Sequence, residues 1–271
     1  MQILTRIYKK FRSYFNFRRA VSDTNAYKNF CKLAANNDEV FKTFRCNPTY
    51  MKVLEHVYED LGKKYYSNIK KTYSYSDNEI FDICKVLHKP GNPKLLEIND
   101  NLQPISPTSL RYLNTALQIK DNFKEKNIKN IIEIGPGYGG QSVILNKFFQ
   151  IDSYTYVDLK EVNLLIEKFI SNFDLNFSSN FLTLSDNFEK SYDLIISNFA
   201  FSELPRNLQT KALKKIISKS TYGFMIMNSH RFVKNYNFHT DEELLRFIPN
   251  FTLSPEVPNT SPNGENYLLT F

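Results

Sequence analysis

Residues 128–142 read Ile-Lys-Asn-Ile-Ile-Glu-Ile-Gly-Pro-Gly-Tyr-Gly-Gly-Gln-Ser, and this stretch decides the fold. Four isoleucines lead into a turn that holds four of the eight glycines of the chain. A β-branched apolar run that ends in clustered glycine indicates a buried strand followed by a tight turn. The apolar residues after Gln141 predict a helix. Strand, turn and helix together let a ligand approach bare backbone amides at the start of that helix.

Two carboxylates narrow the choice of ligand. Glu133 lies just inside the turn, where it can orient the glycine loop or face a cationic ligand, but would be unfavourable beside a pyrophosphate. Asp158 ends the next apolar run, 25 positions later, where an acid can accept hydrogen bonds from both hydroxyls of a ribose. Gly135, Gly137 and Gly140 also match the fingerprint G-x-G-x-x-G. A dinucleotide-binding Rossmann domain therefore remains the alternative.

The segment Glu-Ile-Gly-Pro-Gly-Tyr-Gly-Gly at 133–140, followed by Tyr-Val-Asp at 156–158, resembles the first two motifs of class I S-adenosylmethionine-dependent methyltransferases. The resemblance implies a Rossmann-like α/β fold and S-adenosyl-L-methionine as the cofactor. It also implies cofactor contacts from residues of the glycine turn and of the strand ends that follow. These residues are Glu133, Gly135, Gly137, Tyr138, Gly139, Asp158, Leu159, Asp186 and Asn198.

The apolar runs predict a seven-stranded sheet. The expected strands are 128–134, 154–157, 181–184, 192–198, 222–227, 251–253 and 267–271. The last two are close enough in sequence for an antiparallel edge hairpin, which the class I fold has and an NAD-type Rossmann sheet normally lacks. Ligands of such sheets bind beyond the carboxyl ends of the strands. Six polar residues fall at such ends: Glu133, Asp158, Asp186, Asn198, Glu203 and His230.

The chain should divide into two parts at residues 89–93, Lys-Pro-Gly-Asn-Pro, because clustered Pro, Gly and Asn mark a turn. Residues 1–93 are expected to form a helical N-terminal extension or lid, and residues 94–271 the cofactor-binding domain. Residues 94–104 are expected to be a loop over the cofactor cleft. The Ser-Pro pair at 106–107 then predicts the start of a helix, with Ser as N-cap and Pro in the first turn.

The extension should contain a helix that begins at Asn47-Pro48. Apolar residues from Met51 to Tyr65 recur at helical spacing, which predicts one continuous helix. His56 lies off that apolar stripe beside charged residues, so we expect a histidine on the surface.

Charge is concentrated at the N-terminus. Of the net charge of +7, residues 1–20 supply six basic residues and no acid, which leaves +1 for the rest. A nearly neutral body argues against a long nucleic-acid track, so no nucleic-acid partner is expected. The basic segment could touch an anionic membrane or an acidic partner, or be an ordinary solvated helix. No apolar run is long enough to span a membrane, and three cysteines without paired spacing fit a reducing cytoplasm. We therefore expect a cytoplasmic location. Contact of the protein with the inner membrane surface is left open.

A narrower resemblance, over roughly residues 45–271, is to the bacterial sugar O-methyltransferases of polysaccharide and antibiotic gene clusters. It is carried by the helical N-terminal third and by four short motifs. These are Ser106-Pro107-Thr108 with Tyr112, the turn at 137–141, Ser-Asn-Phe-Ala-Phe-Ser-Glu at 197–203, and Asn228-Ser229-His230. The resemblance implies methyl transfer to a sugar hydroxyl, free or nucleotide-linked, in the synthesis of a surface polysaccharide or a glycosylated metabolite.

A sugar hydroxyl is a poor nucleophile at neutral pH, so a base within hydrogen-bond reach should help. His230 is the first candidate, because histidine titrates near neutrality, and Glu203 is the second. The resemblance also implies acceptor contacts from four residues: Tyr112, Ser202, Asn228 and Arg231. The four histidines and the acids show no metal-ligand spacing, so no metal is expected.

Two other interpretations of the function stay open. The acceptor could be a phosphorylated small molecule, an amine or a nucleic acid, although the loop at 198–201, Asn-Phe-Ala-Phe, lacks the Asn-Pro-Pro-Tyr type of signature. The chain could also be a non-catalytic, cofactor-binding subunit that regulates or scaffolds a partner enzyme. The intact Glu133, glycines and Asp158 argue for cofactor binding in either case.

Overall fold

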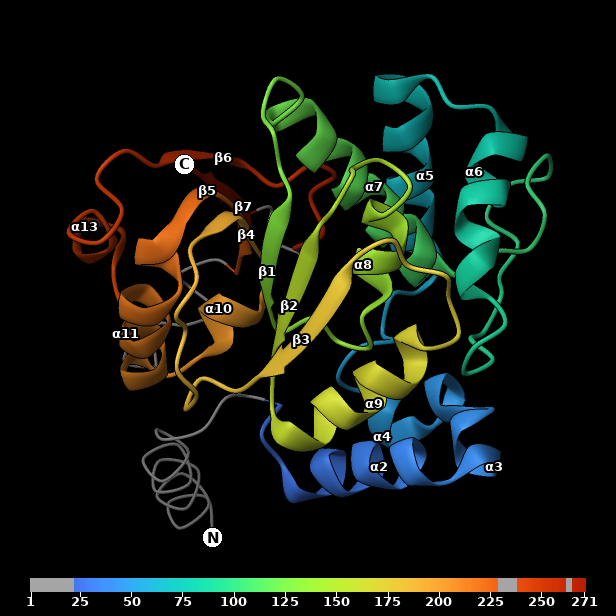
Figure 1. Ribbon diagram of the computed structural model, residues 1–271. Helices are drawn as coiled ribbons and strands as arrows, with labels where there is room; N and C mark the ends of the chain where they lie inside the picture. The colour runs from blue at the N-terminus through green and yellow to red at the C-terminus, as the bar shows by residue number, and fades with distance from the viewer. Residues whose placement is uncertain (1–21, 229–237, 262–264) are drawn as a thin grey trace, which may run out of the picture.

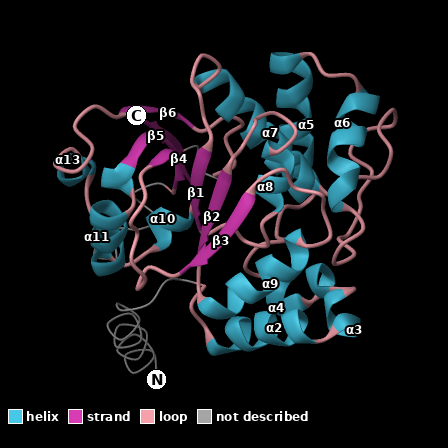
Figure 2. Cartoon of the chain, in the orientation of Figure 1, coloured by secondary structure: helices cyan, strands magenta, loops and turns pink. Residues whose placement is uncertain are grey.

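The computed structural model describes residues 22–228, 238–261 and 265–271, and a seven-stranded mixed sheet forms its centre (Figures 1 and 2). The strands are β1 (Asn130–Ile134), β2 (Ser153–Val157), β3 (Ser178–Leu182), β4 (Tyr192–Asn198), β5 (Ser220–Met227), β6 (Thr252–Pro255) and β7 (Tyr267–Thr270). Their order is β3-β2-β1-β4-β5-β7-β6. The first five run parallel, and β7 pairs antiparallel with both β5 and β6. The predicted strand number and antiparallel edge are confirmed, and the chain has the Rossmann-like α/β architecture that the sequence predicts.

Helices cover both faces of the sheet (Figure 2). One face carries α7 (Pro107–Asn122), α8 (Gly140–Leu145) and α9 (Lys160–Ile170). The other carries α11 (Arg206–Lys215), the 3-10 helix η3 (Ile217–Lys219) and α13 (Asp241–Leu244), while the short α10 (Ala200–Glu203) follows β4 directly. In Figure 1 the first group lies to the right of the sheet and below it, and α11 and α13 lie to the left.

Alternating side chains of the strands build two apolar cores. Ile131 of β1 belongs to the same core as Leu165 of α9, whereas its neighbour Ile132 belongs to the core that contains Leu213 of α11. This follows from the geometry of a strand, in which successive side chains point to opposite faces. Because helices cover both faces, the strands need apolar residues on both, and Ile131, Ile132 and Ile134 of β1 supply them.

The N-terminal part is helical, as predicted. It contains α2 (Asn25–Asn36), α3 (Asp38–Phe41), η1 (Phe44–Cys46), α4 (Pro48–Met51), α5 (Glu59–Tyr73), α6 (Asp77–Cys84) and η2 (Lys85–Leu87). α2 packs against α9, and α5 packs against α7. Tyr27 and Ile69 therefore share a core with Ile131 of the sheet. The division of the chain at residues 89–93 stays a prediction.

The continuous helix expected from Met51 to Tyr65 is wrong. α4 ends at Met51, and α5 begins only at Glu59, so residues 55–58 lie between the two helices without helical structure. The helix is interrupted because residue 55 contacts other parts of the fold. The carboxylate of Glu55 accepts hydrogen bonds from Arg45 Nε at 2.5 Å and from Thr108 Oγ1 at 2.8 Å. These contacts keep residues 55–58 out of a helix, and the helical spacing of apolar residues does not reveal them.

Two further expectations are corrected. Residues 94–104 do not line the cofactor cleft, because the chain folds back on itself there and pairs Leu96 with Ile105 in an isolated antiparallel bridge. The third strand is Ser178–Leu182 rather than 181–184. It ends early because the carboxylate of Asp186 accepts hydrogen bonds from the backbone nitrogen and the hydroxyl of Thr183, at 2.7 and 2.9 Å, and closes a turn.

Within the described ranges, no helix is long and apolar enough to cross a membrane. The basic segment at residues 1–20 lies outside those ranges, so its contact with a membrane or a partner stays a prediction.

Candidate functional site

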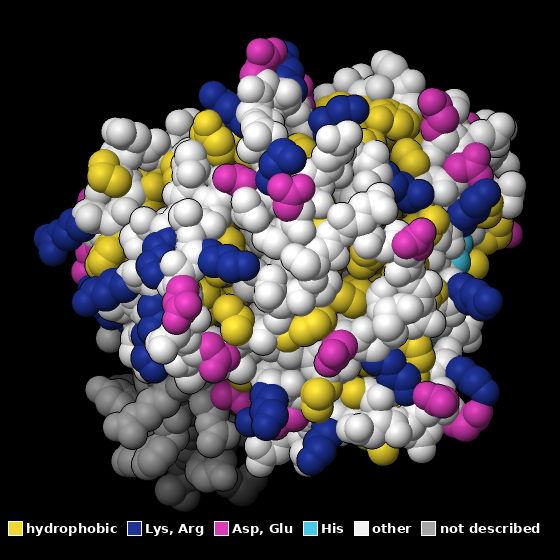
Figure 3. Space-filling view, in the orientation of Figure 1, with side chains coloured by type: hydrophobic (Ala, Val, Ile, Leu, Met, Phe, Trp, Pro, Cys, Tyr) yellow, Lys and Arg dark blue, Asp and Glu magenta, His cyan; other side chains and the backbone are white. Residues whose placement is uncertain are grey.

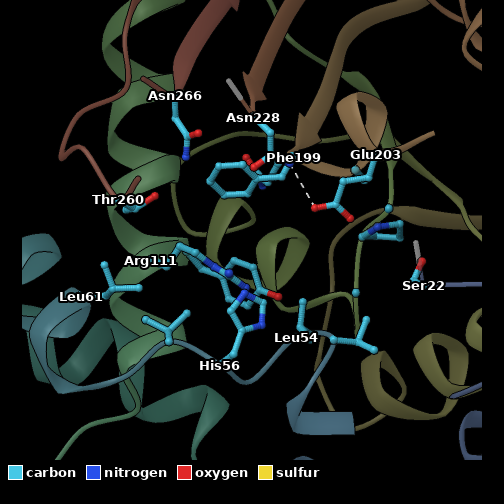
Figure 4. Close-up of a pocket in the computed structure, with 18 of the residues that line it drawn as sticks. Ser22, Leu54, His56, Leu61, Arg111, Phe199, Glu203, Asn228, Thr260 and Asn266 are labelled. Carbon is cyan, nitrogen blue, oxygen red and sulfur yellow. Dashed lines mark hydrogen bonds between the residues drawn. The ribbon is translucent and has the colours of Figure 1, made fainter. Parts of the chain in front are cut away.

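A cavity of about 850 Å³ lies at the carboxyl ends of β1, β2 and β4 (Figure 4). Its volume is in the range of pockets that enclose small molecules and cofactors. Part of the wall comes from residues that the sequence singled out: Tyr112, Glu133, Gly135, Gly137, Asp158, Asn198, Glu203 and Asn228. Residues that are far apart in the sequence thus meet in one cavity, at the sheet edge where the strand ends predicted a ligand site.

The glycine turn after β1 needs its glycines for backbone reasons. Gly135, Gly137 and Gly139 have φ values of +70°, +65° and +86°, in the left-handed region that side chains rarely adopt. A Cβ atom on Gly135 would lie 2.1 Å from the Cβ of Ala200. The turn and the loop after β4 therefore approach each other more closely than any larger residue would allow, and both border the cavity.

Glu133 is a buried carboxylate in the cavity wall. Tyr154 Oη donates a hydrogen bond of 2.6 Å to its Oε2. Burial raises the pKa of Glu133 to about 7, the hydrogen bond from Tyr154 lowers it, and the nearby charge of Asp158 raises it. A cationic group in the cavity would relieve this cost, because it favours the ionised carboxylate.

Asp158 follows β2 and lies in the same cavity. Its backbone nitrogen donates to Leu182 O at 3.1 Å, which ties it to β3, and its Oδ1 accepts from Leu159 N at 2.7 Å. Burial raises the pKa of this carboxyl to about 7 as well. Two carboxylates that both titrate near neutrality make the cavity suited to a ligand with positive charge and hydrogen-bond donors.

The loop after β4 places an amide and an aromatic ring at the cavity. Asn198 lines the wall, and its Oδ1 is buried without a hydrogen-bond partner among the described residues. Phe199 has a φ of +68°, a strained value for a bulky residue. Two hydroxyls hold this geometry: Ser202 Oγ donates to Phe199 O at 2.6 Å, and Ser197 Oγ accepts from Phe201 N at 3.0 Å. Backbone strain of this kind is often found where a loop serves a ligand.

Glu203 and Asn228 face each other across the ends of β4 and β5 (Figure 4). Asn228 Nδ2 donates to Glu203 Oε1 at 3.2 Å and can also donate to Ser202 Oγ at 3.2 Å. Burial raises the pKa of Glu203, and the hydrogen bond from Asn228 lowers it. The pair thus presents a carboxylate that holds a proton more readily than an ordinary glutamate.

Residues 53–57, which we call the cover segment, close one side of the cavity. Leu54 lies over the glycine turn, because a Cβ atom on Gly137 would be 2.8 Å from Leu54 Cδ2. His56 is exposed, so the expected surface histidine is confirmed, and it also borders the cavity. Burial and then the charge of Arg111 lower the pKa of His56.

Several predicted cofactor residues lie elsewhere. The side chain of Tyr138 is fully buried, with the Arg45 guanidinium 4.4 Å from the centre of its ring. Gly139 turns the chain into α8, and Leu159 precedes α9. Asp186 is exposed, and its carboxylate serves the turn with Thr183. None of these four residues lines the cavity, so direct contact with a ligand there is not supported.

Of the four residues predicted to contact the methyl acceptor, two line the cavity. Tyr112 and Asn228 line the cavity, whereas Ser202 lies behind the wall, where its hydroxyl bridges Phe199 O and Asn228 N. Ser202 therefore supports the wall rather than lining it. His230 and Arg231 lie outside the described residues, so their roles stay predictions.

Other cavity residues escaped the sequence analysis: Tyr27, Arg111, Phe199, Thr260 and Asn266. A signal existed for Arg111 only, since a single cation among apolar residues of a helix that packs on a sheet is unusual. Tyr27, Thr260 and Asn266 come from α2 and from the loop between β6 and β7, and no local pattern brings them to the strand ends. Within the described ranges, no group of three His, Cys, Asp or Glu residues could hold a metal ion, and the absence of a metal remains an expectation.

No protein-family model matches this sequence. Two curated proteins similar to it are the ribosomal RNA small subunit methyltransferases A of Borrelia garinii subsp. bavariensis, 35% identical over 114 residues, and of Borreliella afzelii, 36% identical over 113 residues. Each match covers 41% of this chain and 36% of the other protein. The chain therefore spans about a third of the length of these relatives.

Similar solved structures include the methyltransferase domain of bacterial CtHen1-C, at 14% identity and a TM-score of 0.45, covering 59% of this chain and 97% of that one. An S-adenosylmethionine-dependent methyltransferase from Clostridium acetobutylicum is 11% identical with a TM-score of 0.47, covering 59% and 89%. The N-terminal domain of EvdMO1, solved in the presence of SAH and D-fucose, is 10% identical with a TM-score of 0.44, covering 59% and 81%. These similarities are weak, so the description of the fold rests on strand order and pairing.

Proposed function

We propose that this chain is a methyltransferase that uses S-adenosyl-L-methionine to methylate a hydroxyl group of a sugar, free or nucleotide-linked. The observation that carries the proposal is a single cavity at the strand ends that contains Glu133, Asp158 and Glu203 together. Two of these carboxylates suit the cofactor and the third suits the acceptor. The proposed setting is the synthesis of a surface polysaccharide or a glycosylated metabolite.

The residues present fit this cofactor. When bound, it supplies an activated methyl group on a positively charged sulfur. Asp158 can accept hydrogen bonds from the two ribose hydroxyls, and Glu133 can face positive charge. Two buried oxygens in the wall, Asn198 Oδ1 and Tyr112 Oη, have no partner among the described residues and are available to a ligand. Buried polar atoms are normally paired, so unpaired ones in a cavity wall fit a ligand that forms hydrogen bonds with them.

The acceptor half of the proposal rests on Glu203. Its carboxylate is held by Asn228, and burial raises its pKa, so its ionised form is a stronger base than that of an ordinary glutamate. Correct positioning of the two reacting groups can supply several kcal/mol, and a general base adds roughly two to four powers of ten in rate. His230 remains the other candidate for this base. The amide group of Asn228, which lines the same cavity, is suited to a neighbouring sugar hydroxyl.

A turnover assay tests the proposal. The protein is incubated with S-adenosyl-L-methionine and a panel of sugars and nucleotide sugars, and both S-adenosylhomocysteine and the methylated product are measured by mass spectrometry. We expect one sugar class to give both products in equal amounts. Cofactor binding without a methylated product from sugars, amines, phosphorylated small molecules or RNA would instead support a non-catalytic subunit.

The second candidate acceptor is RNA, methylated on a base amine. Two observations favour it: the similarity of 114 residues to ribosomal RNA methyltransferases A, and the juxtaposition of Asn198 with Phe199. An amide oxygen can accept from an exocyclic amine, and an aromatic ring can stack on a base that has been flipped out. The expectation of no nucleic-acid partner therefore stays open to test.

Charge argues against this second candidate. The described residues hold 27 of the 35 Lys and Arg residues and all 28 acidic residues, so their net charge is −1. On the face shown in Figure 3, basic and acidic side chains are interspersed. A protein that binds RNA through phosphates loses affinity steeply as salt rises. RNA that is methylated by the purified protein, with a steep salt dependence, would favour RNA over a sugar.

A further inference from the structure

Arg111 interrupts an otherwise buried helix. From residue 107 to residue 119 of α7, every residue is buried except Arg111, which is partly open because its side chain reaches the cavity. Figure 4 shows this side chain extending into the same space as His56, with Thr260 and Asn266 beyond it. A charged residue in the helix face that packs on a sheet lowers stability unless its charge is paired or binds a ligand.

The guanidinium of Arg111 forms no ion pair with the described residues. Two other arginines in those ranges do: Arg45 is paired with Glu55, and Arg206 is paired with Glu243. The guanidinium carbon of Arg111 lies 5.4 Å from the centre of the Tyr112 ring. An arginine in a cavity wall that forms no ion pair with the protein can be stabilised by a bound anion.

Arg111 lies on the side of the cavity that the glycine turn forms. Its guanidinium lies beside the ring of Tyr112, and the hydroxyl of Tyr112 is 3.4 Å from the position that a Cβ atom on Gly137 would take. Glu133 precedes the same turn and lines the same cavity, and the charge of Arg111 lowers the pKa of Glu133. A cation and a carboxylate therefore both border the turn side of the cavity.

We propose that Arg111 binds the carboxylate of the amino-acid end of S-adenosyl-L-methionine, while Glu133 faces its ammonium group. An amino acid is a zwitterion, and a cation and an anion in one cavity wall match its two charges. The planar fork of an arginine suits a carboxylate, which it can bind through two parallel hydrogen bonds. This assignment rests on the proposed function, and it adds a residue from α7 to the cofactor site.

Ligands that lack parts of the amino-acid end test the assignment. Calorimetry would compare three compounds: S-adenosylhomocysteine, its decarboxylated analogue, and 5′-methylthioadenosine, which lacks the whole amino-acid end. In Arg111→Met we expect S-adenosylhomocysteine to bind about ten- to a hundredfold more weakly, in line with the loss of a charge-assisted pair. The other two ligands should bind the variant and the wild type within about twofold.

Matched variants separate this role from a general effect on folding. Lys120→Met changes an exposed cation of the same helix and should leave all three affinities unchanged. Arg111→Lys keeps the charge and loses the planar fork, so its loss should be smaller than that of Arg111→Met. Unchanged binding of 5′-methylthioadenosine also reports that each variant is folded around an intact nucleoside site.

Three results would overturn the assignment. Equal weakening of all three ligands in Arg111→Met would indicate a structural role. Unchanged affinity for S-adenosylhomocysteine, with a raised KM for the acceptor, would indicate that the guanidinium serves an anionic acceptor. A wild-type protein that binds none of the three ligands would contradict the proposed function itself, which distinguishes that failure from the first two.

Discussion

Arg45 and Glu55 form a buried ion pair that joins the cover segment to the glycine turn. Arg45 Nε lies 2.5 Å from Glu55 Oε1, and the two side chains are 0% and 8% exposed. The same guanidinium stacks on Tyr138 of the turn, and Glu55 also accepts from Thr108 of α7. Because Leu54 and His56 flank Glu55, this pair fixes the position of one whole side of the cavity.

Breaking this pair should destabilise the fold. Glu55→Gln leaves the Arg45 charge buried without a counterion, and we expect the free energy of unfolding to fall by about 3–5 kcal/mol. Urea unfolding followed by circular dichroism measures the change. As a control, Lys42→Met removes an exposed pair with Glu39, in which the side chains are 64% and 80% exposed, and should have no detectable effect. Equal stability of the two variants would contradict the importance of the buried pair.

Asp158 should contribute to cofactor affinity, and Asp186 should not. Asp158→Asn keeps the size of the side chain but removes an acceptor of two hydroxyl protons, so S-adenosylhomocysteine should bind at least about tenfold more weakly. Asp186→Asn is the matched control, because that carboxylate is exposed and serves the turn with Thr183. Calorimetry measures both affinities. Unchanged binding by Asp158→Asn would mean that the ligand does not reach the end of β2.

Cofactor affinity should rise with pH. In the ligand-free protein, burial raises the pKa values of Glu133 and Asp158 to about 7, so both carboxyls are largely protonated at pH 6. A ligand that pairs with ionised carboxylates must displace these protons. We therefore expect tighter binding of S-adenosylhomocysteine at pH 8 than at pH 6, with release of protons. Calorimetry in two buffers of different ionisation enthalpy counts the protons, and a pH-independent affinity without release would refute this reasoning.

The same two carboxyls should make the ligand-free protein less stable as pH rises. Their pKa values in the unfolded chain are near 4, so between about pH 4 and pH 7 the folded state binds more protons than the unfolded state. Stability that depends on this difference is present below the unfolded pKa and is lost as pH rises through the folded pKa. In Glu133→Gln the decline of the unfolding free energy between pH 5 and pH 8 should be shallower than in the wild type.

Glu203→Gln tests the catalytic base. Glutamine can still accept the hydrogen bond from Asn228, so the wall should stay intact while the proton acceptor is lost. We expect kcat to fall by at least about tenfold, as removal of a general base predicts, with cofactor affinity within about twofold of the wild type. His230→Gln in the same assay shows which of the two side chains carries the effect. If neither variant slows turnover at neutral pH, positioning alone drives the reaction.

The pH profile distinguishes a base from a positioning group. Because burial raises the pKa of Glu203, a rate that depends on its ionised form should fall at a higher pH than an ordinary glutamate would give. In Glu203→Gln this fall in rate at low pH should disappear. If the fall persists unchanged, a group other than Glu203 titrates.

The number of strands in the sheet, and the positions of Glu133 and Asp158 at strand ends, could be predicted from the sequence. Those features are local: apolar β-branched runs specify buried strands, and backbone with positive φ specifies glycine. Once the strands are parallel, their carboxyl ends must meet, so the cavity contains Asn198 and Glu203 without any further information.

Which other side chains reach the cavity depends on contacts between distant segments of the chain. The cover segment leaves the helical path because Glu55 binds Arg45 and Thr108, two residues that its own sequence neighbours do not reveal. Asp186 stays outside because Thr183 takes up its carboxylate in a turn. Arg111 enters because α7 presents it, next to Tyr112, to the strand ends. Each outcome depends on contacts between segments far apart in the sequence or on competition for one carboxylate, and neither leaves a periodic pattern in the chain.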